Sequence, residues 1–315
     1  MRIGDETVSD VSWVRKLVWL PVLGVGLTAC ALGAGDSIGQ PSDEAAYLES
    51  VSDVQAGVED GFDRVGEALA SSYNTREVLF SAIRDVGYQE AATSALTLAE
   101  AIVPPEEFSD EHERWLAHRR LAVDKATEIA ESIEVQDLQA MFAVFTALDQ
   151  DWASIVASGH REFCLAVSQS PTFCPAPDDL PGGAYGAEVY EELRLNSLAN
   201  LGLFSFFEDM SPQERSIRLE QVQPHIEANL IAGAEAMRDI DPPDEYETEH
   251  QVLIRYFDEQ YANAVGITKA NAEGDDAAVS QLFTASGAAF ESALTQMSTE
   301  FRIIAAPWIG PESNN

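Results

Sequence analysis

Residues 104–112, PPEEFSDEH, return at residues 242–250 as PPDEYETEH. The match continues without a gap to residue 163 at the same offset, 242 − 104 = 138 residues. Fifteen of the sixty positions from 104 to 163 are identical at this offset, whereas unrelated stretches of ordinary composition agree at roughly one position in fifteen. A self-match at a fixed offset indicates a duplicated structural unit. The sequence therefore predicts an internal repeat.

The repeated stretch and its surroundings have the periodicity of helices. Phe108, His112, Trp115 and Arg119 begin a seam of positions three or four residues apart, which is the spacing of one helix face. Paired prolines suit the first turn of a helix, and Asp241 suits the N-cap before the second pair. The sequence predicts eight helices, at 44–70, 75–103, 105–133, 136–164, 185–208, 211–240, 242–272 and 275–302.

These helices predict an all-α fold. Because short connections favour antiparallel neighbours, we expect two tandem up-down four-helix bundles related by duplication at the 138-residue offset, at 44–164 and 185–302. A connection rich in proline and glycine, 165–184, separates the two repeats. Residues 303–315 form a C-terminal tail in which Trp308 packs against the bundle.

The match is strongest over the last two helices of each repeat and is inferred for the first two. There, Ala46-Tyr47 against Ala184-Tyr185 is the main agreement before Ile102 and Ile240. The run Leu201, Leu203, Phe204, Phe206 and Phe207 cannot lie on one helix face. It either packs between the repeats or forms an exposed patch for a partner.

The N-terminus has the order of a secretory signal peptide. Arg15-Lys16 precedes an apolar run from Leu17 to Leu27, followed by small residues. This run is shorter than the about 20 residues that span a bilayer. One interpretation is an ordinary secretory signal in which Cys30 has no role; the other, a lipoprotein signal, follows from the residues around Cys30.

Residues 27–30, LTAC, resemble the bacterial lipobox. The resemblance implies cleavage before Cys30 and attachment of a diacylglyceryl lipid to its sulfur, with fatty acids such as palmitate. We therefore expect residues 1–29 to be a lipoprotein signal peptide and residues 30–43 to be a flexible tether. Membrane lipid is then a partner through Cys30.

The chain is strongly acidic. It has 54 Asp and Glu residues against 18 Lys and Arg residues, a formal net charge of −36. Removal of residues 1–29 leaves 315 − 29 = 286 residues and the same charge, because that segment has three basic and three acidic residues. A charge of this size repels nucleic acid and anionic membrane surfaces. It excludes direct nucleic-acid binding and favours a monomer.

If Cys30 carries lipid, Cys164 and Cys174 are the remaining cysteines. In an exported chain, two cysteines at short separation favour a disulfide over a metal or redox site. We predict that they form a disulfide within the connection between the repeats.

His112 and His250 correspond at the offset and lie on the helical seam. A hairpin turning near residue 135 brings Glu162 within about one helical turn of His112, and Glu300 has the same relation to His250. A histidine with carboxylates can bind a divalent or ferric ion, or form a buried hydrogen-bonded pair that joins two helices. These four residues are the candidate ligand or metal site, and we favour the structural interpretation, with no cofactor and no firm metal assignment.

No catalytic motif has the required spacing. His112-Glu113 is followed by His118 six residues after His112, not four as in a helical zinc-protease motif. We expect a non-catalytic lipoprotein of the cell envelope, on the outer face of the cytoplasmic membrane or at the outer membrane, that binds a ligand or a protein partner. The alternative is an iron- or zinc-binding envelope protein that uses the duplicated His/Glu site.

Overall fold

The computed structural model describes residues 44–71, 76–168, 170–203 and 210–309, and these ranges contain helices and no strand. The prediction of an all-α fold is therefore confirmed. The expected signal peptide with Cys30, the tether, Phe204, Phe206, Phe207 and the last six residues of the tail lie outside the described residues.

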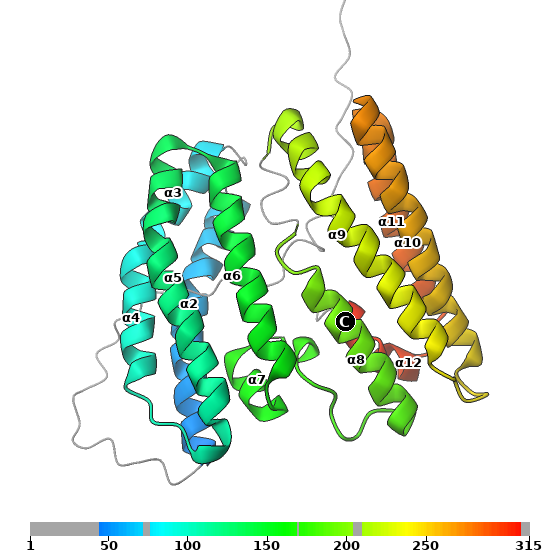
Figure 1. Ribbon diagram of the computed structural model, residues 1–315, viewed down its shortest axis with the longest axis horizontal. Coiled ribbons are helices and arrows are strands. Elements are labelled where there is room, and N and C mark those ends of the chain that lie inside the picture. Colours follow the sequence, from blue (N-terminus) through cyan, green and yellow to red (C-terminus); the bar gives the residue numbers. More distant parts are fainter. Residues whose placement is uncertain (1–43, 72–75, 169, 204–209, 310–315) are drawn as a thin grey trace, which may run out of the picture.

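Figure 1 shows the helices in two groups that lie side by side. The first group contains α2 (Glu44–Ser71), α3 (Arg76–Val86), α4 (Tyr88–Glu100), the short turn η1 (Glu106–Phe108), α5 (Ser109–Val135), α6 (Leu138–Ser158) and α7 (Arg161–Val167). The turn η2 (Pro171–Phe173) follows α7. The second group contains α8 (Gly183–Ala199), α9 (Pro212–Asp239), α10 (Glu247–Glu273), α11 (Asp276–Thr295), α12 (Thr299–Ile304) and α13 (Ala306–Ile309).

Three of the predicted helices are interrupted. The helix predicted at 75–103 divides at Gly87, whose φ of 66° lies in the left-handed region that glycine adopts without steric cost. The helix predicted at 136–164 divides at Gly159 and His160, which are both extended. The helix predicted at 275–302 divides before α12, where the Ser298 side chain accepts a new N-cap hydrogen bond from Phe301 N–H.

The paired prolines precede their helices instead of occupying the first turn. Pro105 is extended, with φ −64° and ψ 159°, and α5 begins only at Ser109. In the second group α10 begins at Glu247 with Tyr246 at the N-cap position, so the predicted start at residue 242 and the predicted N-cap role of Asp241 are wrong. The physical reason is that a proline disfavours the helical conformation in the residue before it, here another proline or an aspartate.

The α5–α6 and α10–α11 connections have the same local chemistry at the 138-residue offset. Gln136 and Gly274 both adopt the left-handed conformation that ends a helix. The next residues are Asp137 and Asp275, and each side chain accepts a hydrogen bond from the backbone N–H three residues later, at 3.0 and 2.9 Å respectively. The left-handed residue and the aspartate N-cap thus form the same turn between the two helices of each antiparallel pair.

The core consists of three clusters of buried side chains. Two lie mainly in the first group, where Phe142, Phe145 and Trp115 are at most 1% exposed. These two clusters also include buried residues of the second group, such as Leu198 and Leu219. The third fills the second group around Leu253 and Phe257. None of the described helices combines the length and apolarity that a membrane span requires.

The two groups are connected through a buried arginine. Arg194 of α8 is 4% exposed and donates hydrogen bonds to the backbone carbonyls of Val156, Ala157 and Phe173. Its Nε donates to Glu191 at 2.7 Å, which supplies a carboxylate partner for the buried charge. Arg194 therefore fixes α8 against the end of α6 and the η2 turn.

The predicted disulfide between Cys164 and Cys174 is present, with an S–S distance of 2.06 Å. Both cysteines are fully buried beside Phe173. The bond ties the middle of α7 to the residue that follows η2.

Candidate functional site

The two candidate histidines are each held by a tyrosine. His112 Nδ1 lies 3.2 Å from Tyr47 Oη, and His250 Nδ1 lies 3.0 Å from Tyr185 Oη. The rings of each pair have centroids 5.8 Å apart, with interplanar angles of 57° and 53°. Both pairs join residues 65 positions apart. The first helix of each group, α2 or α8, is thereby connected to the start of α5 or α10.

The protonation of the His250 ring follows from its second hydrogen bond. His250 Nε2 lies 2.7 Å from the Met237 carbonyl oxygen, which can only accept a hydrogen bond. A neutral His250 therefore carries its proton on Nε2, and its Nδ1 accepts the hydrogen bond that the Tyr185 hydroxyl donates. Tyr47 and His112 share the corresponding Oη–Nδ1 geometry.

Both pairs lie within aromatic clusters of matching composition. Tyr47 stacks on Phe108 with ring centroids 5.5 Å apart, and Tyr185 stacks on Tyr246 at the same distance. Phe163 or Phe301 completes each cluster, and both are fully buried. Such packing stabilises the end of a bundle, and it places the imidazoles among apolar neighbours.

Burial sets the charge states in these clusters. His112 is 2% exposed, and desolvation lowers its pKa below the usual value, with an opposing contribution from the nearby Glu113 carboxylate. Burial raises the pKa of Tyr47 and of Tyr185 above their usual range. The Tyr47–His112 pair is therefore neutral near pH 7.

The hydrogen bonds found for His112 and His250 join them to other residues, not to the glutamates that the sequence predicted as their partners. Glu162 is exposed, and the recorded partner of His112 is Tyr47. Glu300 is exposed and accepts a hydrogen bond from Tyr246 Oη at 2.9 Å. Burial and this carboxylate raise the Tyr246 pKa to about 12. Phe108 occupies the position of Tyr246 in the first group and has no hydroxyl to offer Glu162.

A third histidine, His160, was not selected from the sequence. Its Nδ1 lies 2.6 Å from Glu111 Oε1, and the same oxygen accepts a hydrogen bond from the His160 backbone N–H at 3.3 Å. The Glu111 side chain is 6% exposed, whereas that of His160 is 61% exposed. At the offset, Ser298 takes the place of His160 and caps α12 directly. The start of α7 has no side-chain cap at His160, and the Glu111 carboxylate instead holds the His160 backbone and imidazole in place.

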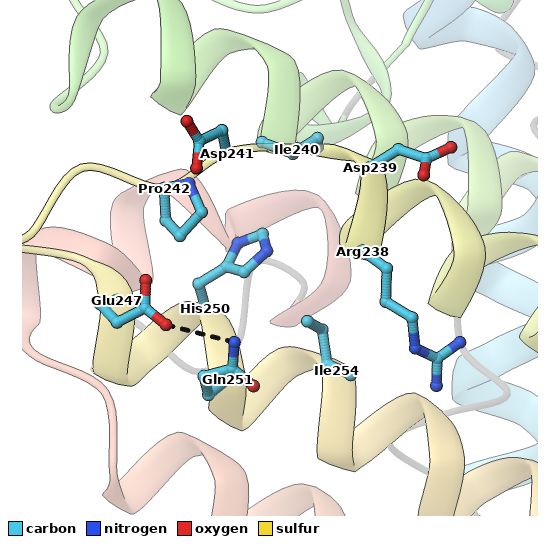
Figure 2. A pocket seen from close by; sticks show the side chains of 9 residues that line it. All are labelled: Arg238, Asp239, Ile240, Asp241, Pro242, Glu247, His250, Gln251 and Ile254. Atoms are coloured by element: carbon cyan, nitrogen blue, oxygen red, sulfur yellow. Dashed lines mark hydrogen bonds between the residues drawn. The ribbon is translucent and has the colours of Figure 1, made fainter.

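An open depression of about 450 Å³ lies beside His250 (Figure 2). It occupies the connection between α9 and α10, and its lining combines acidic and apolar side chains with Arg238. Arg238 pairs with Asp258 at 2.5 Å, and both His250 nitrogens have hydrogen-bond partners within the protein. His250, at the wall of this depression, therefore has a structural role.

Within the described ranges, no group of three or more His, Cys, Asp or Glu side chains has an arrangement that could hold a metal ion. The tyrosines were the residues that sequence reasoning missed. Their signal was the Ala46-Tyr47 and Ala184-Tyr185 agreement, which has the same 138-residue offset as the histidines.

Comparisons with protein-family models, with curated proteins and with solved structures give no match for this chain. Functional conclusions therefore rest on the residues and on the geometry described above.

Proposed function

We propose that this chain is an exported, lipid-anchored protein of the cell envelope that binds a ligand or a protein partner without catalysis. The observation that carries the proposal is that one chain has both a lipobox-like stretch at residues 27–30 and a Cys164–Cys174 disulfide. Disulfides persist in oxidising compartments outside the cytoplasm and are rare inside it. Two independent features of the chain therefore agree on export.

We also propose that the two helical groups are four-helix bundles derived by duplication. The Tyr47–His112 and Tyr185–His250 pairs support this organisation, since both the spacing along the chain and the ring geometry agree. The matching N-caps at Asp137 and Asp275 support the same register for the helix hairpins. The proposed duplication then includes α2 and α8, where the sequence match is weak.

The net charge of −36 bears on the partner. Electrostatic complementarity raises association rates and disfavours partners of like charge. A basic protein segment or a cationic ligand is therefore the partner class that this chain favours, and a monomer is the expected state of the free protein.

Binding of zinc or iron at His112 and His250 is the rival function. The hydrogen bonds of these imidazoles favour a structural role over metal ligation, because the Tyr185 hydroxyl and the Met237 carbonyl already engage both His250 nitrogens. Elemental analysis of purified protein decides between the two. One metal ion per chain, lost on His112→Ala or His250→Ala, would establish the rival.

Metabolic labelling with a fatty-acid analogue in a bacterial host tests the anchor. The wild-type chain should incorporate label, lose residues 1–29 and sediment with membranes. Cys30→Ala should remain uncleaved and unlabelled, while Ser37→Ala, a change outside the lipobox, should behave as wild type. Unlabelled wild-type protein released from membranes would refute the lipid anchor.

A further inference from the structure

Two neighbouring helices of the second group, α9 and α10, expose apolar side chains to solvent. Ile231 on α9 is 40% exposed, and Tyr261 and Val265 on α10 are 37% and 42% exposed. Ala228 and Ala262, each three residues before one of these side chains, are exposed as well. We refer to these five residues as the apolar stripe.

Two contacts between α9 and α10 define the side of the helix pair on which the stripe lies. The Arg238 guanidinium pairs with Asp258 at 2.5 Å. The Thr268 hydroxyl donates a hydrogen bond to Glu227 Oε1 at 2.6 Å. The α9 residues of the two contacts are 238 − 227 = 11 positions apart, which is about three helical turns. Both contacts therefore lie on the same side of α9.

The large members of the stripe lie between these two contacts at helical spacing. Ile231 is four residues after the first contact residue of α9. Tyr261 and Val265 are each three residues inside the two contact residues of α10. Residues three or four positions apart share a helix face. The three side chains therefore line one solvent-facing groove between α9 and α10.

The first helical group has a polar surface at the corresponding positions. Arg120 pairs with Glu100 at 3.2 Å, and the residues 138 positions later are Asp258 and Arg238, which form the same pair with the charges exchanged. The residues 138 positions before the five members of the stripe are Glu90, Thr93, Val123, Asp124 and Thr127. Four of these five are polar, and those four are exposed. The same helix pair thus forms with a polar outer face, so the fold does not require the apolar side chains.

Negative charge surrounds the stripe. Residues 212–273 contain thirteen Asp and Glu residues against five Arg and Lys residues, a balance of 5 − 13 = −8. Arg238, at one end of the stripe, also lines the depression beside His250, together with Asp239, Asp241 and Glu247 (Figure 2). An apolar patch with a polar rim is typical of an interaction surface. Carboxylates around it favour a partner whose apolar residues are accompanied by basic ones.

We propose that the apolar stripe is the docking surface for a basic amphipathic helix of a protein partner. The apolar face of that helix packs on Ile231, Tyr261 and Val265, and its Arg or Lys residues face Asp239 and Asp241. A second copy of this chain does not fit, because the acidic surface would then face itself. The inference depends on the proposed partner-binding function, and it assigns that function a surface and a chemical class of partner.

The test uses the whole chain with Cys30→Ala and a fluorescent synthetic peptide of about 15 residues, a length at which isolated helices begin to form. The peptide has leucines on one helix face and arginines on the other, and fluorescence anisotropy measures its binding. Ile231→Thr with Val265→Thr introduces the residues of the first group without a change of charge, and should raise the Kd about tenfold. Leu98→Thr with Val135→Thr removes two exposed apolar side chains elsewhere and should leave the Kd within about twofold of wild type.

A second variant tests the charge. Asp239→Asn with Asp241→Asn should weaken binding of the arginine peptide at low ionic strength and reduce the dependence of the Kd on salt, because screening acts on exposed charges. A peptide with glutamates in place of the arginines should bind at least about tenfold more weakly than the arginine peptide. Circular dichroism of each variant checks that its helix content is unchanged.

Three outcomes would overturn the proposal. Equal affinity of the arginine peptide for wild type and for Ile231→Thr with Val265→Thr would exclude this surface, while the proposed partner-binding function would stand. No binding of the arginine peptide, or tighter binding of the glutamate peptide, would exclude both the surface and the basic class of partner. A wild-type dimer in sedimentation velocity that the same double variant converts to a monomer would show that a second copy covers the stripe.

Discussion

The Tyr185 hydroxyl donates a hydrogen bond to His250 Nδ1 at 3.0 Å, while His250 Nε2 donates to the Met237 carbonyl at 2.7 Å. One imidazole thus connects α8, α9 and α10. His112 lies beside Tyr47 with the same spacing along the chain and nearly the same ring angle. His250 is therefore a point where three helices meet, and removal of either histidine should affect stability before any binding.

Removal of one tyrosine hydroxyl should destabilise the fold. Tyr185→Phe leaves His250 Nδ1 buried without its donor, at a cost of about 1–3 kcal/mol in the free energy of unfolding. Tyr47→Phe should have an effect of similar size in the first group. Urea titrations measure both, and Tyr261→Phe at an exposed position should stay within about 0.5 kcal/mol of wild type. An unchanged free energy of unfolding in Tyr185→Phe would show that the Tyr185–His250 hydrogen bond contributes nothing to stability.

Stability should fall on mild acidification through His112. Because burial lowers its folded pKa below the unfolded value of 6.5, its contribution is fully present above pH 6.5 and is lost as the pH falls toward and through the folded pKa. His118 acts in the same direction, since burial outweighs the opposing hydrogen bond to Asp151.

Urea titrations of wild type and His112→Gln between pH 8 and pH 5 isolate the contribution of His112. The loss of stability between these pH values should be smaller in the variant, because glutamine does not titrate. Equal losses in the two proteins would contradict the prediction.

Arg194 should be among the costliest side chains to remove. Arg194→Ala takes a donor from three backbone carbonyls and leaves Glu191 without the guanidinium, although the Glu191 carboxylate still accepts a hydrogen bond from Ala176 N–H. We expect a loss of about 3–5 kcal/mol in thermal or urea unfolding. Arg120→Ala breaks an exposed ion pair with Glu100 and should cost less than about 1 kcal/mol. Comparable losses for the two variants would mean that Arg194 does not join the groups.

The disulfide should contribute modestly because its loop is short. Cys164→Ala with Cys174→Ala should lower the free energy of unfolding by about 2–3 kcal/mol, as expected for a sequence separation of 10 residues. Reductant should destabilise the wild type toward the variant and leave the variant unchanged. A loss of stability of the double variant in reductant would show that reductant does not act through the Cys164–Cys174 disulfide alone.

Much of the helical architecture follows from local sequence signals. Apolar seams, the aspartate N-caps at 137 and 275, and the proline–glycine connection determine where helices form and turn. The interruptions at Gly87 and Gly159 were missed because the apolar periodicity continues across both breaks. The predicted starts at the proline pairs were wrong because two consecutive prolines extend the chain before the helix begins.

The sequence by itself determined the helical class, the 138-residue offset, the acidic surface and the two cysteines that pair. It identified the duplicated histidines but predicted glutamates as their partners. Helix periodicity predicts which residues of a hairpin lie at the same height, but it does not predict which side chain of a third helix contacts them. Only the tertiary structure placed Tyr47 and Tyr185 against these imidazoles. Contacts between residues 65 positions apart depend on how α2 and α8 pack, and no local signal contains that geometry.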